Sequence, residues 1–310
     1  MTTSTPATSS GSADPTRPSR FRRSFRLPGV LAEPRVLIGL SVLILLLLIA
    51  LCAPWLAPHA PNDQDLLSTL LPPMWSAGGN PDYPLGTDAL GQCILSRMIY
   101  GARVAMIIAT VAPLGAALLG CVLALLAGYR GGWIDWLIMR VVDIWMSFPA
   151  IVLALVLMVA LSPGLGNVIA AIVLVDWTRF CRVIRSEVVV LRRREYVAAA
   201  RIAGANHPRV ILRDILPGVM PVLISLISIE MGIAVVAESI LSFVGMSVDA
   251  SRPTWGMMIA DGLQNVFSSP WGLILPVLCV VVTVLATTLL GDGLRRSTDP
   301  RLLSRTGAKS

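Results

Sequence analysis

Charged side chains are scarce in this chain of 310 residues, since Asp, Glu, Lys and Arg together make up only 14% of it. A soluble domain carries about 25%, so the composition argues against a soluble globular protein. Hydrophobic residues make up 55%, and the mean hydropathy is +0.76. They stand in long runs, which indicate membrane spans.

Cysteine and histidine are few and widely spaced. None of the five cysteines forms a CxxC pair, and four lie in or next to apolar runs, which argues against a disulfide framework. They are more simply small apolar residues in helices. His59 and His207 are too far apart to suggest a metal site. The cysteines are Cys52, Cys93, Cys121, Cys181 and Cys279.

Motifs of enzymatic chemistry are also missing from the sequence. There is no phosphate-binding loop of the GxxxxGK[ST] type, no zinc motif and no nucleophile elbow. We therefore predict a non-catalytic chain that does not hydrolyse ATP itself. Any energy from ATP must come from a partner.

The N-terminal region raises the question of a targeting signal. Residues 1–18 are rich in Ser, Thr and Pro and are predicted to be disordered, and Arg22-Arg23 is weakly similar to a twin-arginine signal. The apolar run 36–57 is about 22 residues long, or roughly 33 Å as a helix, which exceeds a signal-peptide core. Leu51 before Cys52 is a poor lipoprotein cleavage site. We therefore predict an uncleaved first span.

Six apolar runs predict an all-α membrane protein with six transmembrane helices. The fourth is the least regular, because its apolar run ends at Val175 and is followed by Asp176, Trp177 and Arg179. The predicted spans are 36–57, 102–128, 137–161, 166–184, 219–244 and 271–291.

Arginine placement predicts the orientation. Arginines gather in the N-terminal tail, in residues 185–213 and in the C-terminal tail, whereas the alternate loops hold few against several aspartates. This is the positive-inside pattern, and six spans with both termini in the cytoplasm satisfy it. The residues that give the net charge of +7 thus lie in segments beside the spans and not on the surface of a folded basic domain. We therefore predict no nucleic-acid partner.

Residues 195–217 form a polar connection between the fourth and fifth predicted spans. Small residues favour a helix that ends at Gly204, which tolerates a left-handed conformation. Pro208 is suited to open a new helix, and Pro217 and Pro221 mark the re-entry into the fifth span. Small residues let another backbone approach, so this helix suits a protein socket. An amphipathic helix resting on anionic lipid fits the same pattern.

The same residues resemble the EAA loop in the membrane subunits of binding-protein-dependent ABC importers. That signature is Glu-Ala-Ala, three residues, Gly, nine residues, Ile, one residue and Leu-Pro. Ala199-Ala200, Gly204 and Leu216-Pro217 fall on it in register, whereas Ala198 and Asp214 depart from its Glu and Ile. Glu195-Tyr196-Val197 instead resembles the peptide-transporter branch of the family.

Further motifs of that branch occur in order over about residues 80–302. The chain is similar to the C-type half of dipeptide, oligopeptide or nickel permeases. Tyr83, Gln92 and Cys93 stand where the family commonly has His, Arg and Asp, and Asp176 and Glu230 are unusual for it. The matching stretches are 83–91, 95–103, 126–135, 139–149, 177–185, 238–245, 255–256 and 290–301.

The resemblance implies a subunit of a larger importer in the bacterial plasma membrane. Its partners would be a homologous second permease subunit in a heterodimer, two ABC ATPase subunits, an external substrate-binding protein and the lipid bilayer. ATP and Mg would be bound by the ATPase subunits, with no cofactor in this chain. The small-residue helix would be a cytoplasmic coupling helix between spans four and five that docks on an ATPase. The implied coupling residues are Glu195, Ala199, Ala200, Gly204, Leu216 and Pro217.

We predict four regions from these observations. They are a disordered basic cytoplasmic tail (1–35), the first span with an external segment (36–101), the importer transmembrane domain (102–294), which holds the five-helix core, and a cytoplasmic tail (295–310).

Four acids lie in apolar context, where a charge is costly unless it faces protein or water. We predict that they lie in the pathway or at a subunit interface, with Glu238 the leading candidate. Arg140 and Asp143 are three residues apart on one helical face and are predicted to pair. The four acids are Asp143, Asp176, Glu230 and Glu238.

The external stretches 58–97 and 246–270 are predicted to meet the binding protein, with Trp255 and Trp271 as interfacial anchors. The resemblance to the peptide-transporter branch implies peptides as substrates, ahead of nickel chelates, glutathione or another small solute. An ion-coupled secondary transporter is the main alternative, because it would explain buried acids and an interrupted span. It would not explain the ordered motifs.

Overall fold

The computed structural model describes residues 33–249 and 251–298. The predicted tails lie outside these ranges, except for residues 33–35 and 295–298. Within the described residues the secondary structure is helical, with one isolated bridge between Thr87 and Cys93. The helices are α2 Pro34–Leu51, α3 Ala53–Leu56, α4 Ile94–Arg130, α5 Gly132–Met146, α6 Ala150–Leu161, α7 Leu165–Arg192, α8 Glu195–Ile202, α9 His207–Val210, the π-helical turn η1 Ile211–Ile215, α10 Leu216–Phe243, α11 Trp255–Gln264 and α12 Trp271–Thr298.

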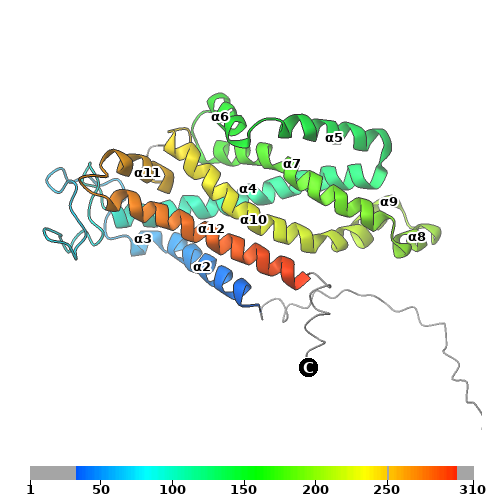
Figure 1. The fold of residues 1–310 in the computed structure, drawn as a ribbon, viewed down its shortest axis with the longest axis horizontal. Helices are drawn as coiled ribbons and strands as arrows, with labels where there is room; N and C mark the ends of the chain where they lie inside the picture. The colour runs from blue at the N-terminus through cyan, green and yellow to red at the C-terminus, as the bar shows by residue number, and fades with distance from the viewer. Residues whose placement is uncertain (1–32, 250, 299–310) are drawn as a thin grey trace, which may run out of the picture.

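The long helices lie side by side in an elongated bundle (Figure 1). α7 packs along α4, α10 packs on both α4 and α12, and α12 packs on α2. The loops before α4 and the helix α11 lie at one end of the bundle. The start of α2, the end of α12 and the short helices α8 and α9 lie toward the other end.

Four helical stretches are long and apolar enough to cross a membrane, namely Pro34–Leu51, Ile94–Arg130, His207–Phe243 and Trp271–Arg296. A fifth span is present if α5 and α6, which meet at a 90° bend, are counted together. The predicted fourth span lies within α7, which carries Asp176, Arg179, Arg182, Arg185 and Glu187 and is not among the four. Length and hydropathy therefore support four or five spans.

The predicted third span, 137–161, was wrong as a single helix. It starts earlier, at Gly132, and breaks between Met146 and Ala150. Phe148 precedes Pro149, and a residue before proline is disfavoured in the helical region, while proline lacks the N–H that the helix needs. The hydropathy of the run concealed this break.

Small residues let α4 approach α7 closely. A Cβ atom on Gly120 would lie 2.5 Å from the carbonyl oxygen of Trp177 and 2.6 Å from the Cβ of Phe180. Ala109, Ala112 and Ala116 of α4 are fully buried. Packing of this kind is typical of helix contacts in membranes, where small residues bring backbones together. The core is therefore centred on α4.

Trp255 is a core residue, so its prediction as an interfacial anchor was wrong. It is 1% exposed, and its indole N–H donates to the carbonyl of Met98 at 3.1 Å. Gly101 makes room for the ring, since a Cβ there would lie 2.8 Å from it. Trp271 is partly buried and meets Trp75 edge to face.

Candidate functional site

The segment 195–217, here called the connecting segment, has the predicted helix and turn. α8 spans Glu195–Ile202, and Gly204 follows with φ +82°. The N–H of Ala205 donates to the carbonyl of Ala200, five residues back, and the N–H of Gly204 donates to Arg201, both at 3.0 Å. This is a Schellman-type end, which glycine favours. α9 then starts at His207 with Pro208 in its first turn, as predicted.

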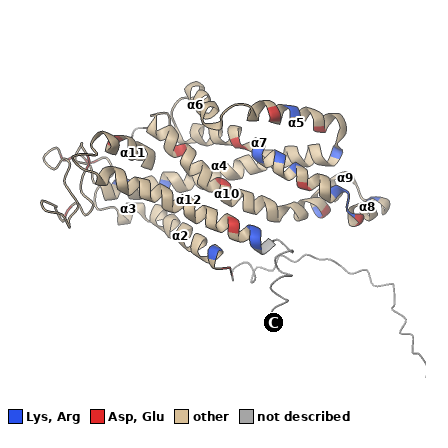
Figure 2. Cartoon of the chain, viewed as in Figure 1, with Lys and Arg blue, Asp and Glu red and all other residues tan. Residues whose placement is uncertain are grey.

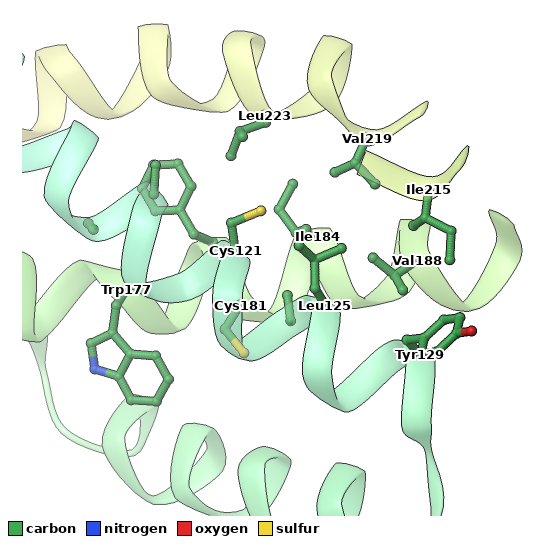
Figure 3. Close-up of a cluster of buried hydrophobic side chains, with 14 of the residues drawn as sticks. Cys121, Leu125, Tyr129, Trp177, Cys181, Ile184, Val188, Ile215, Val219 and Leu223 are labelled. Carbon is green, nitrogen blue, oxygen red and sulfur yellow. The ribbon is translucent and has the colours of Figure 1, made fainter. Parts of the chain in front are cut away.

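The connecting segment has one buried side and one open side. Val197, Val210 and Ile215 are fully buried in a hydrophobic cluster with Val188, and Figure 3 shows Ile215 near Val188 and Tyr129. On the open side, Ile202 is 88% exposed and Leu212 is also exposed. Of the predicted coupling residues, Glu195, Ala199, Gly204 and Pro217 are exposed, whereas Ala200 and Leu216 are half-buried.

Tyr129, at the end of α4, holds the connecting segment against the bundle. Its hydroxyl lies 2.8 Å from Nδ1 of His207, and the guanidinium of Arg201 lies 4.9 Å from the centre of its ring. Arg192 of α7 donates to the carbonyl oxygens of Tyr129 at 2.8 Å and Gly128 at 3.2 Å. Tyr129 lies within the matching stretch 126–135, but no local pattern indicates its contact with His207, 78 residues away.

Three arginines on α7, spaced three residues apart, each meet an acid from another helix. Arg179 pairs with Glu230 of α10, Arg182 with Asp143 of α5, and Arg185 with Asp135 of α5. A step of three residues turns the side chain by about 60° around a helix of 3.6 residues per turn. The first arginine therefore faces α10 and the other two face α5. Figure 2 shows the charges of α7, α5 and α8 on an otherwise mostly uncharged bundle.

The predicted pair of Arg140 and Asp143 was wrong. Asp143 pairs with Arg182, and the Arg140 guanidinium lies 5.6 Å from the centre of the Trp136 ring, one turn away. Pairs within one helix add only a few tenths of a kcal/mol, so a tertiary contact easily overrides them.

Glu230 and Asp176 are buried between helices. They are 1% and 4% exposed, and Arg179 reaches Glu230 with an N–O distance of 3.2 Å while its own side chain is 38% exposed. A charge buried away from water is tolerated only when it is paired or hydrogen-bonded. Arg179 therefore compensates the buried charge of Glu230.

Glu238 belongs to a different hydrogen-bond network, near the C-terminal end of α10. It is 1% exposed and accepts hydrogen bonds from Ser242 at 2.6 Å and Ser247 at 3.3 Å. Thr254 donates in turn to Ser242 at 2.7 Å. These contacts tie the turn after α10 to the start of α11.

Arg97 links three segments at the end of the bundle that holds α11. It pairs with Asp88 in the loops before α4 and lies 3.5 Å from Asp261 of α11. Burial raises the pKa of Asp261, and the positive charge of Arg97 opposes that rise.

In the loops before α4, burial also raises the pKa of Tyr83, whose hydroxyl donates to Asp65 at 3.4 Å.

In the part of the chain that the structure describes, no cluster of three or more His, Cys, Asp or Glu side chains could hold a metal ion.

Four helical stretches that are long and apolar enough to cross a membrane, packed with the charged helix α7, define an integral membrane protein. Residues 120–304 match the family described as the binding-protein-dependent transport system inner membrane component, and the chain belongs to this family. Residues 31–73 match the N-terminal TM domain of oligopeptide transport permease C.

Relatives align over most of the chain. It is 39% identical to the dipeptide transport system permease protein DppC of Escherichia coli (strain K12), over 86% of this chain and 88% of that protein. It is 35% identical to the protein of the same name from Bacillus subtilis (strain 168), over 85% of this chain and 81% of that protein. It is 37% identical to the nickel transport system permease protein NikC of Escherichia coli (strain K12), over 87% of this chain and 95% of that protein. The resemblance to C-type importer permeases is confirmed.

Proposed function

We propose that this chain is the C-type permease subunit of an ATP-driven importer for di- and oligopeptides. Relatives named for dipeptide transport share 35–39% of its residues, and the connecting segment supplies the partner surface that such a subunit needs. The observation that carries the proposal is this segment, with an anchored inner side and an open side that exposes Ile202 and Leu212. The nickel relative keeps nickel chelates as the second candidate.

The proposed topology has six spans with both termini in the cytoplasm. α7 would be the remaining span despite its charges, because α4, α5 and α10 pack around it and three of its arginines pair with acids. The start of α2, which carries Arg35, and the end of α12, which carries Arg295 and Arg296, lie toward the same end of the bundle as α8 and α9 (Figure 1). The positive-inside rule then favours that end as cytoplasmic.

The connecting segment is proposed to dock on an ATPase subunit that binds ATP and Mg. Glu195, Ala199 and Ala200 would contribute to the contact through α8. Gly204 would set its turn, and Leu216 and Pro217 would join it to α10. A second permease subunit would complete the pathway, and an external binding protein would meet the end that holds α11.

The four acids of the spans divide by exposure. The side chain of Asp143 is 48% exposed, so with Arg182 it is proposed to face the pathway or the second subunit. Asp176, Glu230 and Glu238 are at most 4% exposed, so we propose that they hold helices in place beside the pathway or interface.

Ile202→Asp is expected to weaken ATPase binding at least tenfold without reducing membrane insertion. The side chain is 88% exposed at the end of α8, and apolar anchors at the centre of an interface carry much of its binding energy. The measurement is co-purification of the ATPase with the permease pair in detergent. Leu67→Asp, at a 98% exposed leucine in the loops before α4, is the matched control. Equal ATPase recovery for both variants and wild type would remove α8 as the docking element.

The substrate is tested with the reconstituted complex and its binding protein. We expect ATP hydrolysis to be stimulated by a dipeptide panel and not by nickel chelates. Stimulation by chelates alone would replace the peptide assignment.

A further inference from the structure

Tyr129 is the side chain through which α4 meets both halves of the connecting segment. It contacts Arg201, which precedes the Gly204 turn, and His207, which follows it. A side chain that touches both sides of a turn restrains the angle between α8 and α9. The geometry of the proposed docking helix α8 therefore depends on a residue that lies outside the connecting segment.

α8 has one fully buried side chain, Val197. Ala200 is partly buried against the same cluster, and the exposed end of the helix carries Ile202. The ring of Tyr129, by contrast, is 6% exposed and belongs to the cluster that joins α4, α7 and α10 (Figure 3). Arg192 holds the backbone carbonyl of Tyr129, so this residue is fixed to α7 as well. The Tyr129 contacts thus join a firmly packed core to a lightly packed helix.

α4 extends this connection to the opposite end of the bundle. It runs for 37 residues, or roughly 55 Å at 1.5 Å per residue. At its start Arg97 binds Asp88 and Asp261, and the carbonyl of Met98 accepts from Trp255. A displacement of α8 carried by Tyr129 would therefore reach α11 and the external loops through one helix.

We propose that Tyr129 is a positioning residue that transmits motion between the connecting segment and α4. Its hydroxyl restrains α9 through His207, and its ring face restrains α8 through Arg201. This inference rests on the proposed importer function. It assigns to this side chain a contact through which movement of α8 reaches α4.

The test uses the complete reconstituted complex with its ATPases and binding protein. Tyr129→Phe removes the hydroxyl and keeps the ring face, whereas Tyr129→Leu removes both. We expect the number of ATP molecules hydrolysed per peptide transported to rise about threefold for Phe and at least tenfold for Leu. ATPase co-purification should stay at the wild-type level, because the open side of α8 is unchanged. Tyr100→Phe, on the same helix, is the control and should keep the wild-type ratio.

A merely structural role predicts a different result. Complex yield, ATP hydrolysis and transport would then fall together, and the ratio of ATP to peptide would stay constant. A constant ratio in Tyr129→Phe, with ATPase bound, overturns the inference, and this variant is mild enough to decide the question if Tyr129→Leu fails to fold. Failure of the proposed function is separate, because the wild-type complex would then show no peptide-stimulated ATP hydrolysis.

Discussion

Gly204→Leu is expected to lower peptide uptake at least tenfold while membrane insertion and ATP hydrolysis persist. Gly204 has φ +82°, a conformation that costs an L-residue with a side chain roughly 1–2 kcal/mol. A Cβ there would meet no atom of this chain within 4 Å, so no clash inside the subunit adds to that strain. The turn between α8 and α9 would relax, and α8 would no longer be aimed at its partner. Uptake and ATP hydrolysis in proteoliposomes measure the effect.

Two control variants separate backbone strain from the position of the turn. Gly204→Asn should retain most uptake, because asparagine tolerates the left-handed region. Gly245→Leu places the same side chain after α10, at φ +78° and again with no atom within 4 Å, and should leave the coupling ratio unchanged. Normal uptake by Gly204→Leu would show that the connecting segment does not couple ATP hydrolysis to transport.

Arg179→Leu is expected to destabilise the subunit strongly. It leaves Glu230, whose side chain is 2% exposed, without its arginine and beside Asp176. Removing one partner of a buried ion pair costs about 3–5 kcal/mol, and the 38% exposure of Arg179 places this case toward the lower end. Loss of the folded fraction on heating in detergent is the measurement.

The companion variants give this prediction its specificity. Arg182→Leu should cost less, because both Arg182 and Asp143 have side chains nearly half exposed. Adding Glu230→Gln to Arg179→Leu should restore part of the lost stability, since it removes the unpaired charge. If Arg179→Leu unfolds at the same temperature as the wild type, the ion pair with Glu230 does not stabilise the subunit.

Local patterns predicted most helix positions well. The bounds of α10 and α12 are close to those of the predicted spans 219–244 and 271–291. A long apolar run and a flanking proline determine helix position through residues that are near in sequence. The same locality explains the success in the connecting segment, where Gly204 follows the end of α8 and Pro208 lies in the first turn of α9. It also explains the error at Pro149, where hydropathy was given more weight than the proline.

Contacts between distant segments were not predictable in this way. Trp255 was assigned to the interface because tryptophan is common there, yet Gly101 provides it a buried site 154 positions earlier in the chain. Asp143 was paired with its neighbour Arg140, although Arg182 of another helix binds it. Each choice depends on which faces of two helices meet, and hydropathy does not report this.

The sequence by itself determined the class of protein, its family and the ends of the connecting helix, because apolar runs, ordered motifs, glycine and proline act through local physics. Only the tertiary structure decided which acids the arginines of α7 bind, and that Tyr129 joins α4 to both sides of the Gly204 turn. These contacts join residues 39 to 78 positions apart. They exist because the packing of α4, α5, α7 and α10 brings particular helix faces together.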